Sequence, residues 1–197
     1  MMMTLYTATI TLILVMDPLG NIPLFLTILR HYDFKTQRKI IIRETIVAFI
    51  ILCVFLFFGK YLMRGLDITT SALSIAGAIV LFLISIRMIF PSDTKENPNQ
   101  EVEEPFIVPL AIPLTAGPSA IAVVMLFVAR NPSRLPLLFS AVTIASISFL
   151  VIMLLARYLM RLFGTRGLIA IERLMGMILT TIAVQMLLSG IAALNIH

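Results

Sequence analysis

Residues 16–23 read Met-Asp-Pro-Leu-Gly-Asn-Ile-Pro and lie in the middle of an otherwise apolar segment, 4–30. Proline removes a backbone donor and clashes with the preceding helical turn, so Pro18 and Pro23 predict a break in that segment. Asp17 suits an N-cap and Pro18 suits the first helical position, which predicts a helix that starts at Asp17. A break of this kind inside lipid leaves backbone groups that only protein or water in a cavity can satisfy.

The composition of the whole chain indicates that its surroundings are lipid. Hydrophobic residues make up 60% of the 197 residues and charged residues 13%, against roughly 45–50% and about 25% in soluble domains. The net charge of +5 would suggest nucleic acid only if the basic residues formed one face of a water-exposed fold, so we expect no nucleic-acid partner. The single cysteine, Cys53, excludes an intrachain disulfide and a cysteine-based metal cage. We expect no metal site and no cofactor other than a coupling Na⁺ or H⁺.

About 20 apolar residues span a bilayer core about 30 Å thick. Stretches of that length predict an all-α polytopic membrane protein with six transmembrane helices, at 4–30, 40–63, 68–90, 105–130, 135–157 and 168–194. The intervening segment 91–104 is acidic, polar and contains proline, which is typical of a solvated linker.

The two halves of the chain resemble each other. Lys-Tyr-Leu-Met-Arg at 60–64 recurs as Arg-Tyr-Leu-Met-Arg at 157–161, although short matches arise easily by chance in an apolar chain. Because three helices per half is an odd number, the second copy would enter the membrane inverted, as in many secondary transporters. The sequence therefore predicts a first repeat, an acidic cytoplasmic linker and a second, inverted repeat, at 1–90, 91–104 and 105–197.

A second break is predicted within 109–119, which reads Pro-Leu-Ala-Ile-Pro-Leu-Thr-Ala-Gly-Pro-Ser. Pro113 and Pro118 interrupt the fourth apolar stretch near its middle, and Gly117-Pro118 repeats the cap pattern of the first break. Two half-helix N-termini would then meet near the membrane midplane, where their partial positive charge suits an anion such as a carboxylate. The alternative is a pair of proline kinks that only shape the bundle.

Asp17 is the one acid in the middle of any predicted span, and such residues usually face a cavity or a partner. It could be a structural cap, or a site for an ammonium group, a proton or Na⁺. A zwitterion fits the two breaks, with its ammonium toward Asp17 and its carboxylate toward the amides of 117–119. We expect Glu172 at a solvated helix end, and we expect Asn21 either to bind ligand or to cap the break. The predicted substrate-binding residues are Asp17, Gly20, Asn21, Thr115, Gly117 and Ser119.

The basic residues predict the orientation, because cytoplasmic connections carry an excess of Lys and Arg. With both termini in the periplasm, all but four of the 15 Lys and Arg residues lie on cytoplasmic connections. The four on the outer connections are Lys60, Arg64, Arg130 and Arg134.

The motifs at 16–25 and 109–121 together resemble the paired signature of the MarC family, and the resemblance covers nearly the whole chain. It implies a six-helix, multi-pass protein of the bacterial inner membrane. It also implies similarity to transporters of small neutral amino acids in that family.

The sequence favours a secondary transporter of small neutral amino acids, coupled to H⁺ or Na⁺, over two other classes. A non-transporting scaffold or regulator would leave both polar breaks without a use. An intramembrane enzyme would need a nucleophile and base at one depth, and no second polar group of that kind accompanies Asp17 or Ser119, so we expect no enzyme. No P-loop pattern occurs, which disfavours ATP-driven transport within this chain. A homo-oligomer is compatible with all of these.

Overall fold

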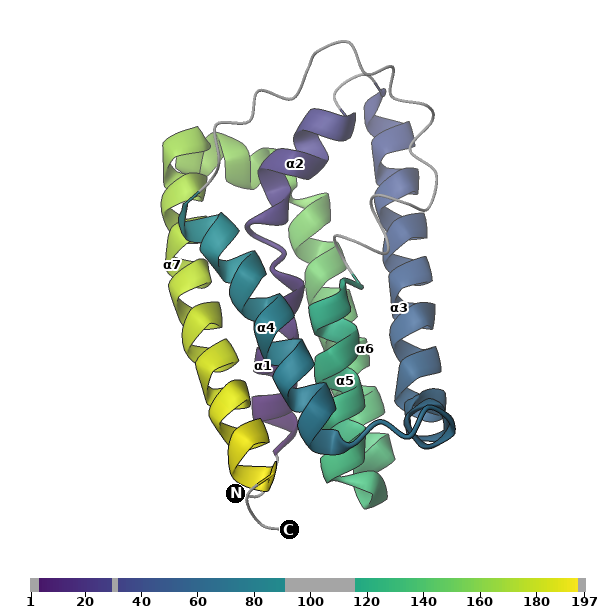
Figure 1. The fold of residues 1–197 in the computed structure, drawn as a ribbon. Helices are drawn as coiled ribbons and strands as arrows, with labels where there is room; N and C mark the ends of the chain where they lie inside the picture. Colours follow the sequence, from purple (N-terminus) through teal and green to yellow (C-terminus); the bar gives the residue numbers. More distant parts are fainter. Residues whose placement is uncertain (1–3, 30–31, 91–115, 195–197) are drawn as a thin grey trace.

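The computed structural model describes residues 4–29, 32–90 and 116–194, and all regular structure within them is helical (Figure 1). The elements in chain order are α1 (Leu5–Met16), α2 (Asn21–Ile28), α3 (Phe34–Gly65), α4 (Thr70–Ile89), α5 (Pro118–Arg130), the short 3-10 helix η3 (Pro132–Arg134), α6 (Leu135–Leu154) and α7 (Ala156–Leu194). The all-α prediction is confirmed for these residues. The predicted linker 91–104 lies outside them, as do Pro113 and Thr115 of the second motif.

Four of the helical stretches are long and apolar enough to cross a membrane: Phe34–Gly65, Thr70–Ile89, Pro132–Leu154 and Arg166–Leu194. They coincide with the four apolar stretches that have no proline near their middle, which confirms a multi-pass membrane protein. Within the two stretches predicted to be interrupted, the apolar helices are shorter, Leu5–Met16 and Ser119–Arg130.

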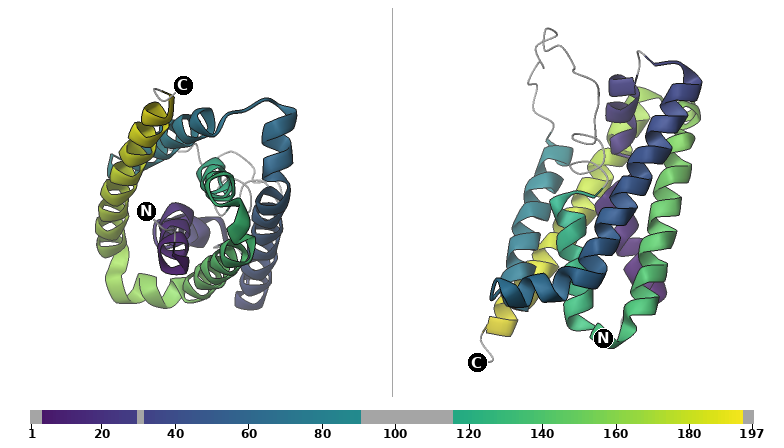
Figure 2. Two further views of the ribbon diagram at one scale, coloured as in Figure 1. Left: turned by 90° about the horizontal axis from the view of Figure 1, so that it is seen from below. Right: turned by 90° about the vertical axis from the view of Figure 1, so that its right-hand side faces the viewer.

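The two shorter helices α1 and α5 lie inside a ring formed by the four long helices, as the view along the bundle shows (Figure 2). Helix α5 is apolar nearly all round, and Val123, Val124 and Leu126 on its different faces are each at most 2% exposed. A helix that is apolar on every face is stable only where it is surrounded. The polar motifs at the end of α1 and the start of α5 are therefore carried into the interior of the bundle.

Helices α4 and α7 pack closely through small residues. The Ser74 hydroxyl donates across the interface to the Met186 carbonyl at 2.9 Å, and the Thr180 hydroxyl donates to Ser85 Oγ at 2.9 Å. A Cβ on Gly176 would lie 3.0 Å from the Ser85 carbonyl oxygen, so glycine is required for this approach. Close contact through small residues, with hydroxyls bonding across it, is the usual basis of helix association in lipid.

The corner between α2 and α3 is fixed by side chains at the start of α3. Gln37 is buried, and its amide donates to the carbonyls of Leu29 at 2.6 Å and Tyr32 at 3.0 Å. Asp33 is the N-cap of α3. The Thr36 hydroxyl and amide, with the Lys35 amide, hold the pKa of Asp33 below its usual range. These contacts turn the chain by satisfying the last carbonyls of α2 and the first amides of α3.

The connection between the predicted spans ending at 157 and beginning at 168 is helical. Residues 156–163 continue from α6 after a single turn residue, Leu155, and run across one end of the bundle (Figure 1). Gly164, with φ 65°, then redirects the chain into the long part of α7. Such a left-handed φ suits glycine because it has no Cβ. The beginning of α1 and the end of α7 lie at the same end of the bundle (Figure 1).

Candidate functional site: an internal polar cavity

The first motif forms a tight turn between α1 and α2, and Asp17 has a different role there from the one predicted. It is the C-cap of α1, with left-handed dihedrals of φ 44° and ψ 63°, and its amide still donates to the Ile13 carbonyl at 3.0 Å. The prediction of an N-cap at Asp17 is therefore wrong: the hydrogen-bond ladder of α1 runs through this residue, and aspartate tolerates the left-handed region better than most residues. Its carboxylate Oδ1 accepts a hydrogen bond from the Gly20 amide at 3.1 Å.

Gly20 and Asn21 hold this turn together. The Asp17 carboxylate occupies the space in which a side chain on residue 20 would begin, so a larger residue there would displace the carboxylate from its present position. The Asn21 side-chain amide donates to the carbonyls of Met16 at 3.1 Å and Asp17 at 2.9 Å. Of the two roles expected for Asn21, the structure shows the capping one, and these bonds satisfy carbonyls at the end of α1.

The second motif begins α5 in the way the sequence predicts. Gly117 is the N-cap and Pro118 lies in the first turn, and no side chain caps this end. The Ser119 amide belongs to the unpaired first turn of the helix, where backbone N–H groups carry a partial positive charge. Ser119 is only 4% exposed. The start of α5 is thus a buried group of donors.

The two motifs meet at one cavity of about 300 Å³. Five of the six predicted substrate-binding residues line it, and the sixth, Thr115, lies outside the described residues. The five are Asp17, Gly20, Asn21, Gly117 and Ser119, which come from sequence positions about one hundred apart. Pro23 lines it too, with Val15 and Met16 from α1, and Ile84 and Met88 from α4. The cavity therefore has an acid at the end of α1, helix amides at the start of α5, and apolar walls.

Glu172 of α7 also lines this cavity, which the sequence did not predict. It was expected at a solvated helix end because it is close to the beginning of the sixth apolar stretch. The distance of Glu172 from the end of the apolar stretch indicates how deep it lies in the membrane. The kink at Gly164 determines the direction in which this face of α7 points. Two carboxylates, Asp17 and Glu172, therefore face one small internal space.

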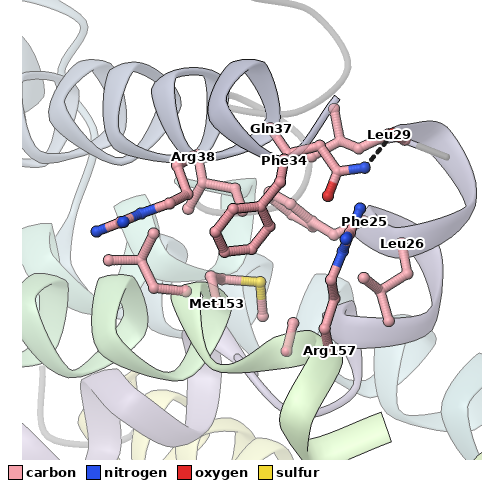
Figure 3. A pocket seen from close by; sticks show the side chains of 11 residues that line it. Phe25, Leu26, Leu29, Phe34, Gln37, Arg38, Met153 and Arg157 are labelled. Carbon is pink, nitrogen blue, oxygen red and sulfur yellow. Dashed lines mark hydrogen bonds between the residues drawn. The ribbon is translucent and has the colours of Figure 1, made fainter. Parts of the chain in front are cut away.

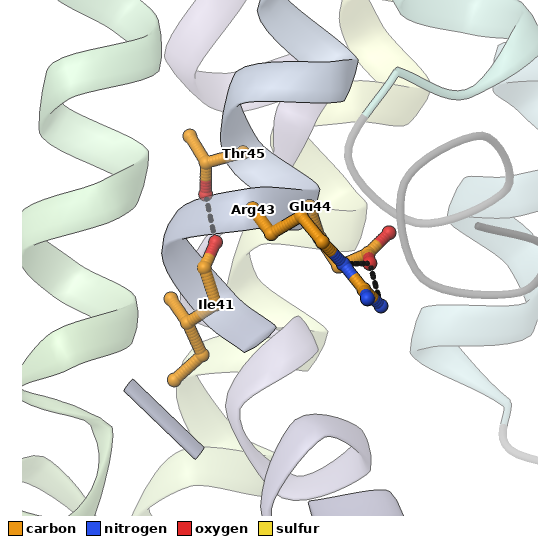
Figure 4. Close-up of polar contacts among 4 residues, drawn as sticks. All are labelled: Ile41, Arg43, Glu44 and Thr45. Carbon is orange, nitrogen blue, oxygen red and sulfur yellow. Dashed lines mark hydrogen bonds and ion pairs between the residues drawn. The ribbon is translucent and has the colours of Figure 1, made fainter. Parts of the chain in front are cut away.

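Another acid, Glu44 of α3, is fully buried and does not line this cavity. Figure 4 shows its contact with Arg43. Its Oε1 pairs with Arg43 Nη2 at 2.7 Å, and the Glu44 side chain is 1% exposed against 51% for Arg43. The other carboxylate oxygen, Oε2, has no hydrogen-bond partner among the described residues. Adjacent residues on a helix normally point in different directions, so the sequence offered no sign of this pair.

Several long apolar helices, packed around a cavity that charged and amide groups line, define a multi-pass helical membrane protein. The chain belongs to the MarC family: residues 2–195 match the family described as MarC family integral membrane proteins. Since this match covers nearly the whole chain, the resemblance drawn from the two motifs is confirmed.

Relatives support the same assignment. The chain is 49% identical over 185 residues to a UPF0056 membrane protein of Buchnera aphidicola subsp. Schizaphis graminum, covering 94% of each chain. It is 45% identical over 185 residues to the UPF0056 inner membrane protein YhgN of Escherichia coli K12, covering 93% of this chain and 94% of the relative. A UPF0056 membrane protein of Chlamydia trachomatis is 32% identical over 199 residues, covering 100% of this chain and 97% of the relative. No solved structure matches the chain. These similarities support a multi-pass protein of the bacterial inner membrane.

Proposed function

We propose that this protein is a secondary transporter of small neutral amino acids, with its substrate bound in the cavity between the two motifs. The observation that carries the proposal is the convergence of Asp17 and the first turn of α5 on one internal space. A carboxylate and unpaired helix amides provide opposite partial charges, which suit the ammonium and carboxylate of a zwitterion. The volume is at the lower end of the range for ligand pockets, which favours a ligand with few heavy atoms.

The architecture proposed for transport is a three-plus-three inverted repeat. In this proposal the α1–α2 and α5 regions are the broken first helices of the two halves, and both breaks lie near mid-membrane. The central position of α1 and α5 within the ring of long helices supports it (Figure 2). Alternating access would come from one half rocking against the other around a fixed site. Both termini would face the periplasm, and the beginning of α1 and the end of α7 lie at one end of the bundle, as this requires (Figure 1).

Ion coupling is assigned in this proposal to the carboxylates of the cavity. Asp17 is the predicted coupling residue, and Glu172 adds a second acid beside it. An acid that faces an internal cavity in a membrane protein is a common place for a proton or Na⁺. Two acids and one substrate ammonium leave a negative charge that a coupling cation would neutralise.

Counterflow of radiolabelled alanine, glycine, serine and threonine into proteoliposomes tests the proposal, under imposed gradients of H⁺ or Na⁺. We expect saturable counterflow by the unaltered protein. Asp17→Asn should raise the half-saturating concentration about 10- to 100-fold, because it removes one charge-assisted hydrogen bond. Asp67→Asn is the matched control: Asp67 is also left-handed, with φ 53°, but does not line the cavity. Folded protein that gives no counterflow under any gradient would refute transport and favour a scaffold.

A further inference from the structure

The outward-facing seam between α3 and α6 contains a second hollow, independent of the proposed transport site. Its volume is about 170 Å³, and its walls include Ile46 and Phe49 of α3 and Ile147 and Leu150 of α6. Ile46 is 52% exposed and Ile147 is 55% exposed. Both helices are long and apolar enough to cross a membrane. The hollow therefore opens toward the hydrocarbon of the bilayer and is shaped by two rigid helices.

Two arginines lie at one end of the same seam, on either side of the Phe34 ring (Figure 3). The Arg38 guanidinium carbon is 5.9 Å from the ring centroid, and that of Arg157 is 5.3 Å from it. Arg38 follows Phe34 by one turn of α3, whereas Arg157 comes from the first turn of α7. One aromatic ring thus holds two cations from helices far apart in sequence, since a guanidinium is attracted to a ring face at this distance.

Neither arginine is neutralised within the part of the chain that the structure describes. The ion pair formed there joins Arg43 to Glu44, and no carboxylate in those residues pairs with Arg38 or Arg157. Two like charges that share one ring repel each other, so an anion beside both of them would be stabilising. The planar donor fork of arginine matches the oxygens of a phosphate.

The spacing along the seam matches one phospholipid. Arg38 precedes Thr45 by seven residues, and Arg157 follows Leu150 by seven, and both Thr45 and Leu150 line the hollow. At 1.5 Å per residue, Arg38 is about 10 Å along the axis of α3 from the hollow, and Arg157 lies just beyond the end of α6 at Leu154. The headgroup layer on each side of a bilayer is about 5–8 Å thick. A phosphate held at the arginines would therefore bring its acyl chain alongside the hollow.

We infer that the α3–α6 seam is a binding site for an anionic phospholipid. Its phosphate lies beside the exposed Phe34 ring, within reach of Arg38 and Arg157, and one acyl chain fills the hollow between Ile46 and Ile147. Phe34 positions the two guanidiniums and so separates the charged part of the site from its apolar part.

Tryptophan fluorescence tests this inference cleanly because the chain contains no tryptophan. Ile46→Trp places the probe in the hollow, and Ile79→Trp places it on an exposed part of α4 as the control. Each variant is reconstituted in mixtures of brominated phosphatidylglycerol and brominated phosphatidylcholine, whose chains quench tryptophan on contact. At position 46, phosphatidylglycerol should bind at least fivefold more strongly than phosphatidylcholine, since each cation contributes about fivefold near a membrane surface. At position 79 the ratio of phosphatidylglycerol binding to phosphatidylcholine binding should be near one.

Charge variants identify the source of the preference. Arg38→Gln with Arg157→Gln should bring the ratio at position 46 to near one, while Lys60→Gln with Arg64→Gln, at the other end of α3, should leave it unchanged. Continued quenching by phosphatidylcholine in the first double variant shows that the hollow is still formed. A ratio near one in the unaltered background, or a preference that survives loss of both arginines, would overturn the inference. Protection of the probe at position 46 from both lipids would also overturn it, because a second copy of the chain would then cover the seam.

Discussion

Replacing Gly176 by alanine should push α4 and α7 apart. The added Cβ would lie 2.9 Å from Ile89 Cγ1, 3.0 Å from the Ser85 carbonyl oxygen and 3.1 Å from Met88 Cβ. The Ile89 methylene belongs to a side chain that can rotate, but the other two atoms belong to the backbone of α4 or are fixed to it. The helices must therefore separate by a few tenths of an ångström at this level.

The size of the effect follows from two opposing contributions. Overpacking of a close contact costs about 1–3 kcal/mol. Alanine in place of glycine in a helix returns up to about 1 kcal/mol through helix propensity. The net loss of stability should be about 1–2 kcal/mol, and the hydrogen bond from Thr180 to Ser85 beside Gly176 should weaken as well.

Unfolding by titration with sodium dodecyl sulfate in mixed micelles, followed by circular dichroism, measures this difference. Gly65→Ala is the control, because nothing lies within 4 Å of a Cβ at residue 65 of α3. That variant should be as stable as the parent, or more stable by less than about 1 kcal/mol. If Gly176→Ala is also as stable as the parent, α4 and α7 do not approach each other as closely at Gly176 as these distances state.

Two further substitutions test other contacts by the same unfolding assay. Ser74→Ala removes the hydrogen bond to Met186 and should cost about 0.6 kcal/mol, with an upper bound of roughly 1.7 kcal/mol; an unchanged midpoint would contradict that bond. Arg43→Gln leaves the buried Glu44 carboxylate without its ion-pair partner and should cost about 1–3 kcal/mol. The double change Arg43→Gln with Glu44→Gln should recover part of that loss. A double variant that is less stable than Arg43→Gln alone would contradict this expectation and show that the ion pair itself stabilises the fold.

The parts of the fold that follow from local chemistry could be predicted from the sequence. The spans without a proline near their middle became the four long helices, and the Gly117-Pro118 pair became the start of α5. Both depend on neighbouring residues alone, since cap geometry and proline sterics act within one turn.

Features that depend on tertiary contacts could not be predicted in this way. Asp17 became a C-cap because the hydrogen bonds of α1 extend to it, and sequence alone does not show where such a ladder stops. Glu172 turned toward the cavity because of the direction that the chain takes after Gly164. We expected residues 17–21 and 117–119 to lie together, and residues from both stretches line the common cavity.

The central claim is that both motifs line one substrate site, and protection of introduced cysteines tests it most directly. In a Cys53→Ala background, Asn21→Cys and Ser119→Cys place one thiol in each motif, and Ser133→Cys provides an exposed thiol outside the cavity. The rate of reaction with a methanethiosulfonate reagent is measured against the concentration of a transported amino acid. The account predicts that the amino acid slows modification at 21 and 119 with the same half-saturating concentration and leaves position 133 unaffected. Protection at only one of the two motifs, or at neither, would contradict it.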